Sequence, residues 1–299
     1  MTAHKRNEAR AWVGNILALT SAVAFAFSST SASLAFYGGS NPMTLAAVRF
    51  VLPAVVLVIW LTAQGRSFWL PKRDGWIAVA LGAVTAAYSW ALLSAIGAIP
   101  LALAILIFYL FPLVAIVILG LFGWEKLGWK TIAAIVVAFA GLALALDPRI
   151  PRFDVAGMSL AFLAALGLGG VVAVSSRVLR AGDSRPVTLY MAAVSAVLLI
   201  AFCAMQGGFV LPHTTTGWVG FVAAALLYAF ALIAFFVAIS MIGPARSSLL
   251  CYAEPVIAAG LGVVLLGEQL TLMQISGIFL VVGALVGATL LQRQKQAQA

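Results

Sequence analysis

The chain carries an internal repeat with an offset of 143 residues, the separation of Tyr109 from Tyr252. The ungapped matches pair Tyr109 with Tyr252, Pro112 with Pro255, Glu125 with Glu268, Leu127 with Leu270, Ile132 with Ile275 and Ile135 with Ile278. With a small change of register, 42–45 (PMTL) matches 186–189 (PVTL), and 75–76 (GW) matches 217–218 (GW). Because proline, glycine and glutamate recur, and not only common apolar residues, the repeat predicts two structurally related halves.

Composition assigns these halves to a membrane. Hydrophobic residues make up 64% of the chain and charged residues only 8%, a balance that soluble globular domains do not have. A helix needs about 20 apolar residues to span the hydrocarbon core. Ten segments qualify: 12–37, 43–63, 75–99, 101–124, 128–146, 155–176, 187–206, 217–241, 247–267 and 270–291. The short alternating segments of a membrane β-barrel do not occur, so we predict an all-α integral membrane protein with ten transmembrane helices.

The basic residues indicate the orientation of these helices. Of the 17 lysines and arginines, Arg149 and Arg152 fall on one side of the predicted membrane and Arg49 falls inside a span. The other 14 fall on the side of the two chain ends. Since cytoplasmic segments carry an excess of lysine and arginine, we expect both tails, 1–10 and 292–299, in the cytoplasm.

Each predicted half, 11–147 and 154–291, contains five spans. Because five is an odd number, the two halves cross the membrane in opposite directions. Inverted repeats of this kind are typical of transporters that give alternating access to a site near the middle of the membrane. The fold class we predict is therefore ten transmembrane helices arranged as two inverted five-helix repeats.

Two charged residues, Arg49 and Glu254, are expected well inside the spans. An ionisable side chain at that depth is costly and suggests a functional role. Glu254 is a candidate to bind the amino group of a substrate or to carry a proton; alternatively, it pairs with Arg49 or stays neutral as a structural group. Arg49 lies close enough to the span's end for its side chain to extend to the surface, or it contacts a substrate carboxylate.

Prolines occur at equivalent places in two corresponding spans, which in transporters points to the binding site. Pro112 and Pro255 are predicted helix hinges, although simple kinking for packing is the alternative. Ser248, Tyr252 and Pro255 lie at helical spacing, as do their counterparts Ile105, Tyr109 and Pro112. We therefore expect Tyr109, Tyr252 and Ser248 to face a substrate.

Other residues within the spans are candidates on weaker grounds. Tyr88 and Trp90 lie deep in the third span, whereas such side chains usually sit at membrane interfaces; packing explains each equally well. Ser28 belongs to a hydroxyl-rich stretch that either lines a hydrated path or bonds back to its own helix. Gly167 and Gly170 permit either bending or close packing.

The sequence also excludes several classes of protein. It has no soluble domain and no nucleotide-binding motif, which excludes ATP-driven pumping by this polypeptide alone. No histidine or aspartate lies within a predicted span, so the groups of an intramembrane hydrolase cannot be assembled there. The expected partners are a small-molecule substrate and membrane lipid, with no nucleic acid, no ATPase subunit, no metal and no cofactor.

The chain resembles the EamA branch of the drug/metabolite transporter superfamily. The resemblance rests on the ten spans, on 254–256 (EPV) followed by 266–270 (LGEQL), and on a diverged first copy at Pro112 and 125–127 (EKL). It covers essentially the whole chain and implies a bacterial inner-membrane carrier that exports amino acids or small metabolites. The segment 252–256 (YAEPV) is similar to the aromatic amino-acid exporters of the YddG type. Export of hydrophobic cationic drugs or of other small metabolites is the alternative.

Overall fold

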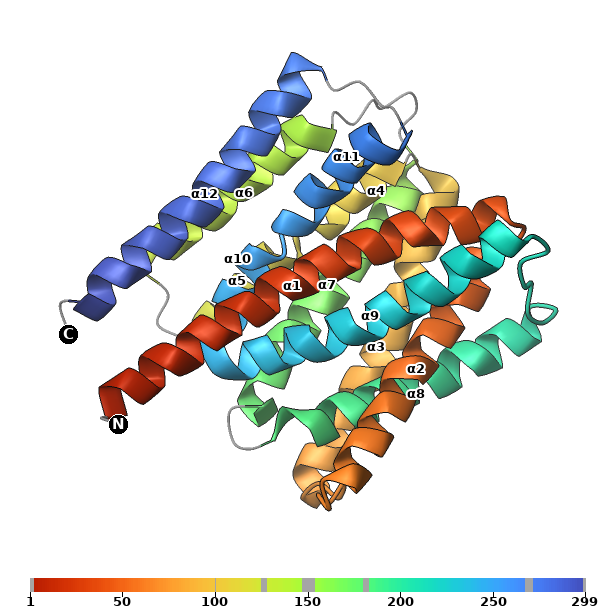
Figure 1. Cartoon of the computed structure of the whole chain (residues 1–299), viewed down its shortest axis with the longest axis horizontal. Coiled ribbons are helices and arrows are strands. Elements are labelled where there is room, and N and C mark those ends of the chain that lie inside the picture. Colours follow the sequence, from red (N-terminus) through yellow and green to blue (C-terminus); the bar gives the residue numbers. More distant parts are fainter. Residues whose placement is uncertain are drawn as a thin grey trace.

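The computed structural model describes residues 3–99, 101–124, 128–146, 154–179, 183–266 and 271–297. Within these ranges every element of regular structure is a helix (Figure 1). The helices are α1 (Ala3–Tyr37), α2 (Pro42–Ala63), α3 (Lys72–Ala98), α4 (Leu101–Phe108), α5 (Phe111–Leu121), α6 (Trp129–Leu146), α7 (Val155–Leu179), α8 (Ser184–Met205), α9 (Thr215–Ile242), α10 (Pro244–Leu250), α11 (Ala253–Leu266) and α12 (Leu272–Ala297). The predicted all-α class is confirmed.

The helices account for the ten predicted spans. Among the described residues, seven runs are long and apolar enough to cross a membrane: α1, α2, α3, α7, α8, α9 and the α4–α5 segment Leu103–Leu121. Shorter apolar stretches in α6 and α12, Trp129–Ala145 and Leu272–Gly287, and the α10–α11 pair supply the rest. Large apolar side chains are exposed along the helices, for example Leu121, Val264 and Phe279, as expected of a surface that faces lipid. The chain is a multi-pass membrane protein.

Two of the spans are interrupted at equivalent positions of the repeat. The break between α4 and α5 falls at Tyr109 and Leu110, and that between α10 and α11 falls at Cys251 and Tyr252. Each break comes just before a proline, which lacks the N–H needed to continue the helical hydrogen bonds. The sequence predicted one bent span at each place, whereas the structure has two short helices.

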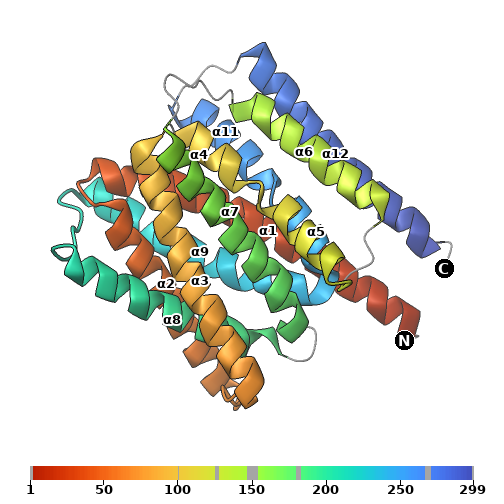
Figure 2. The same ribbon diagram turned by 180° about the vertical axis from the view of Figure 1, so that it is seen from behind.

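Each main helix pair joins the two halves of the repeat. Helix α1, the first of its half, packs along α9, the third of the other half. The reciprocal pair, α7 with α3, is also in contact but over a smaller region, and α2 lies against α8 (Figure 2). Helices α6 and α12 form a separate pair along one edge of the molecule (Figure 1). This reciprocal pairing is the arrangement expected of two structurally related halves.

Close contact between α1 and α9 depends on small residues. A Cβ atom on Gly220 would lie 2.6 Å from the Ser31 carbonyl oxygen and 2.6 Å from Leu34 Cβ. Two serines of α1 strengthen this contact, because Ser21 Oγ donates to the Ala231 carbonyl and Ser28 Oγ donates to the Ala224 carbonyl. The hydroxyl-rich face of α1 therefore bonds to a neighbouring helix as well as to itself.

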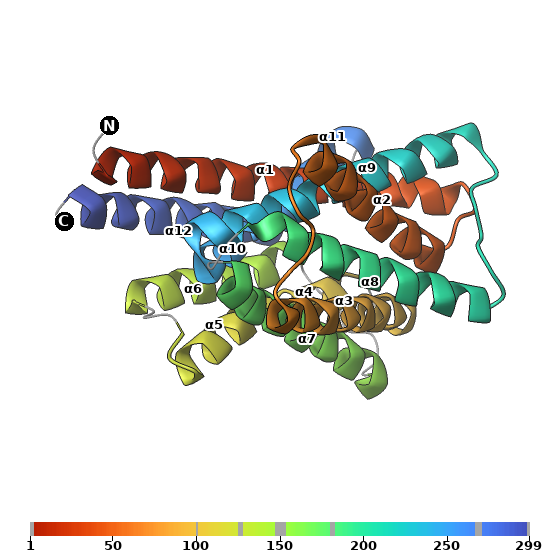
Figure 3. The same ribbon diagram turned by 90° about the horizontal axis from the view of Figure 1, so that it is seen from below.

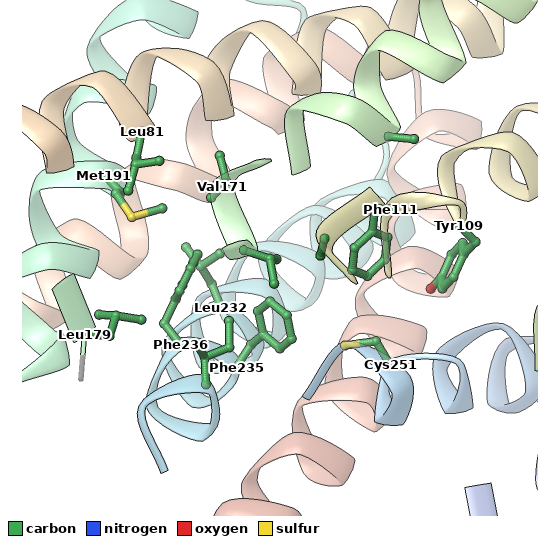
Figure 4. Packing of buried hydrophobic residues seen from close by; sticks show 14 of the residues in the cluster. Leu81, Tyr109, Phe111, Val171, Leu179, Met191, Leu232, Phe235, Phe236 and Cys251 are labelled. Carbon is green, nitrogen blue, oxygen red and sulfur yellow. The ribbon is translucent and has the colours of Figure 1, made fainter. Parts of the chain in front are cut away.

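The start of α1 and the end of α12 lie at the same end of the bundle (Figure 3). An even number of crossings requires this placement. The largest group of buried apolar side chains draws on α2, α3, α5, α6, α7, α8, α9, α10 and α12. Figure 4 shows part of this group, with Leu232 near Phe235 and Phe111 on the side of Tyr109. Glu125, Glu268, Arg149 and Arg152 lie outside the described residues.

Candidate substrate-binding site

Arg49 of α2 lies against aromatic side chains inside the bundle instead of extending to the surface. Its guanidinium carbon is 4.4 Å from the centre of the Tyr228 ring and 5.8 Å from that of Phe50. Its Nε atom is buried and has no hydrogen-bond partner among the described residues. A cation over an aromatic face gains about 0.5–2 kcal/mol, but a buried donor without an acceptor costs about 1–3 kcal/mol. Arg49 therefore keeps a donor that an anionic group could use.

Tyr228 of α9 is the centre of a small aromatic cluster. The rings of Phe25 on α1 and Phe50 on α2 meet it edge to face, with centroids 5.5 Å and 5.3 Å away. Edge-to-face contacts of this kind hold aromatic rings in defined orientations. Three helices from both halves thus fix the surface against which Arg49 lies.

Glu254 provides the opposite charge. It is the second residue of α11, where the positive end of the helix dipole favours a carboxylate. The hydroxyl groups of Tyr109 and Ser29 are its polar neighbours, and Arg49 acts on it from a greater distance. Among the described residues the ion pair of the chain is Arg185 with Asp183, and Arg49 makes none with Glu254. Ser29 is exposed on α1, whereas Glu254 is only partly exposed.

Tyr109 and Tyr252, the repeat-related tyrosines, meet where the two interrupted spans cross. Their ring centroids are 5.7 Å apart, and the Tyr252 hydroxyl donates a 2.9 Å hydrogen bond to the Tyr109 carbonyl. Tyr109 is 5% exposed and Tyr252 0%. In this conformation Tyr252 is therefore a structural contact, while the Tyr109 hydroxyl is directed toward Glu254.

The two aromatic residues of the third span separate. Tyr88 packs on Phe108 with centroids 6.2 Å apart and lies within electrostatic range of Arg49 and Tyr228. Trp90 is 39% exposed and packs on Phe202 of α8. Residues two apart on a helix point to nearly opposite sides, so only Tyr88 joins the charged groups.

The two candidate serines have different surroundings. Ser28 is bound to the Ala224 carbonyl at 2.8 Å and so connects α1 to α9. Ser248 of α10 is fully buried, and its Oγ lacks a partner within the described part of the chain. Thr85 and Ser89 of α3 have buried hydroxyls in the same condition. Such groups are costly unless a ligand, a water molecule or another conformation satisfies them.

Of the candidate hinges, the two prolines lie at the helix breaks and the two glycines do not. Pro112 and Pro255 are buried near the starts of α5 and α11. Helix α7 runs unbroken through Gly167 and Gly170. A Cβ atom on Gly167 would lie 2.7 Å from Tyr88 Cβ, while Gly170 faces open space. Gly167 thus allows α3 and α7 to pack closely here, and hinge motion at all four residues remains a prediction.

The site residues predicted from the sequence did not include Phe25, Phe50, Ser29 or Tyr228. Tyr228 carried a usable signal, because it is a tyrosine in the middle of a long apolar span. Ser29 was visible only as part of a serine-rich stretch. Phe25 and Phe50 look like any other apolar residues in a membrane helix.

Comparison with known proteins agrees with the fold and the repeat. The model of the EamA-like transporter family matches residues 12–146 and again residues 155–290. A solved structure titled "Crystal structure of protein" is 22% identical, with a TM-score of 0.80, and the match covers 94% of this chain and 98% of that one. No curated protein matches significantly. The two family matches together span most of the sequence, and the chain belongs to the EamA-like transporter family.

Proposed function

We propose that this transporter exports neutral amino acids, aromatic ones above all, from the bacterial cytoplasm. Its two repeats, 11–147 and 154–291, would expose the site alternately to the two sides of the inner membrane. The observation that carries the proposal is the presence of one cation, Arg49, and one carboxylate, Glu254, that face the same interior region without pairing directly.

A zwitterion matches this arrangement. Its ammonium group would lie at Glu254, and its carboxylate would accept from the free Nε of Arg49. An aromatic side chain would pack against Tyr228 and Tyr88. An unpaired buried charge costs several kcal/mol. A ligand that pairs with both charges removes both costs, and this favours its binding.

The runner-up, export of hydrophobic cations, is favoured by the carboxylate beside aromatic rings. It is disfavoured by Arg49, which would repel a second cation near Tyr228. Sugar phosphates fit less well, since a phosphate is usually bound by several basic groups and Arg49 is the basic residue found in the described part of the site.

Counterflow in proteoliposomes tests the proposal. Vesicles loaded with unlabelled phenylalanine should accumulate labelled phenylalanine, and Arg49→Gln should reduce this exchange at least about tenfold, the equivalent of 1.4 kcal/mol. Phenylalanine methyl ester lacks the carboxylate, so it should inhibit phenylalanine exchange by the wild type and by the variant equally well. Exchange of hydrophobic cations without exchange of any amino acid would reject the proposal in favour of its runner-up.

A further inference from the structure

The hydrogen bond between the two repeat-related tyrosines is asymmetric. Tyr252 donates to the carbonyl of Tyr109, while the hydroxyl of Tyr109 lies near Glu254. The repeat makes the two residues equivalent, yet in this conformation each has a different partner. An equivalent bond with the roles reversed would run from the Tyr109 hydroxyl to the Tyr252 carbonyl.

The interrupted helices explain why such carbonyls are available. An unbroken helix would use the Tyr109 carbonyl for the N–H four residues later, but the chain turns at Tyr109 and Leu110 before α5 begins. The turn at Cys251 and Tyr252 is the matching place in the other half. Within a membrane no bulk water can satisfy a freed carbonyl. Tyr252 supplies such a donor at the Tyr109 break, and Tyr109 is the equivalent residue at the other break.

Transporters with inverted repeats open alternately to the two sides as one repeat rocks against the other, and two related halves can do so by exchanging their geometries. The pairings of α1 with α9 and of α7 with α3 are reciprocal contacts of this kind. If the halves exchange geometries, the helix break at Tyr109 takes the geometry that the break at Tyr252 has in this structure. The break at Tyr252 then takes the geometry of the break at Tyr109.

We propose that Tyr109 and Tyr252 form a reciprocal latch, in which Tyr252 donates to the Tyr109 carbonyl in one state and Tyr109 donates to the Tyr252 carbonyl in the other. The latch rests on the alternating access of the proposed function. It also ties the site to the conformation, because Tyr109 must leave Glu254 in order to donate. The counterpart of Glu254 is Phe111, so Tyr252 meets no carboxylate after the exchange, and the two states differ in energy.

The latch is tested by the population of the two states, without any substrate. Spin labels at Tyr37 and Val155, exposed residues of the two halves, report the distance between the halves. Tyr252→Phe removes the donor of the observed state and should shift the population away from it by about tenfold, as the loss of one hydrogen bond predicts. Tyr109→Phe removes the donor of the other state and should shift the population in the opposite direction. The double variant should return toward the wild-type ratio.

Two controls separate the latch from other effects. Ser29→Ala removes the other hydroxyl neighbour of Glu254 without altering either helix break. The population shift that it causes therefore shows how much of the Tyr109→Phe shift comes from the loss of a polar neighbour of Glu254. Tyr88→Phe removes a buried tyrosine hydroxyl elsewhere in the site. Shifts of both tyrosine variants in the same direction, or no shift in either, would overturn the latch. Because no substrate is present, either result leaves the amino-acid proposal standing, and failed amino-acid exchange leaves the latch standing.

Discussion

Glu254 and Phe111 hold equivalent positions in the two halves, and their difference is the clearest departure from internal symmetry at the site. Arg49 adds a second departure, since its counterpart in the register that pairs 42–45 with 186–189 is Ala193. Both charged residues come near Tyr228, and neither is neutralised by a direct ion pair among the described residues. The backbones of the two halves are thus similar, while a few side chains that differ between the halves carry the charges of the proposed site.

Tyr88 and Trp90 provide a matched pair for testing which side of α3 faces the site. Tyr88→Leu should reduce amino-acid counterflow about three- to tenfold, because an aromatic contact contributes about 0.5–1.5 kcal/mol beyond its area. Trp90→Leu should change the rate less than about twofold, since Trp90 packs on Phe202 away from the charged groups. Rates are compared at equal amounts of reconstituted protein. Equal losses in both variants would place the site elsewhere on α3.

The residue patterns could indicate some of these roles but not others. Intramembrane charge singled out Arg49 and Glu254 because charge is rare and costly at that depth. The difference between Tyr88 and Trp90 could not be predicted in this way. In a membrane helix both the lipid-facing side and the interior side are apolar, so the periodicity that reveals a buried face in soluble proteins is lost. The partner of Tyr252 depends on how the halves meet, which no single span encodes.

At the level of helices, prolines gave the positions of both interruptions, and small residues set the spacing of the long pairs. The breaks before Pro112 and Pro255 follow from the missing N–H of proline. Glycines carry more varied roles, and their surroundings decide between them. Gly220 is closed in by the backbone of α1, whereas a side chain on Gly170 would meet nothing within 4 Å.

The helix contact between α1 and α9 can therefore be tested by adding a methyl group at Gly220, with Gly170 of α7 as the control position. Gly220→Ala should destabilise the protein by about 1–3 kcal/mol, because the new methyl group would overlap the Ser31 carbonyl and Leu34. Gly170→Ala should be neutral or stabilising by up to about 1 kcal/mol, since alanine favours helix over glycine. Thermal unfolding in detergent measures both. A lower melting temperature for the Gly170 variant than for the Gly220 variant would contradict this account of the contact.

At the scale of the whole molecule, the two halves are related by reciprocal helix pairs, and the ends of the chain lie together (Figure 3). Inversion means that the first helix of each half begins on a different side of the membrane. Trp12 and Val155 lie near those two beginnings and are 61% and 74% exposed, while Tyr37 marks the far end of α1. The positive-inside distribution of arginine and lysine predicts a direction, in which the start of α1 faces the cytoplasm.

Single cysteines at these three positions, in a Cys203→Ala and Cys251→Ala background, test inversion and direction together. Cysteine at Tyr37 and at Val155 should react with a membrane-impermeant maleimide added to spheroplasts, whereas cysteine at Trp12 should react only after the membrane is permeabilised. Both native cysteines are buried and lie outside α1 and α7, away from the three labelled positions. Labelling of Trp12 and Val155 positions from the same side would contradict inverted halves, because each half would then enter the membrane in the same direction. Labelling in the reverse pattern would keep the inversion but contradict the charge rule, since the 14 basic residues would then face outward.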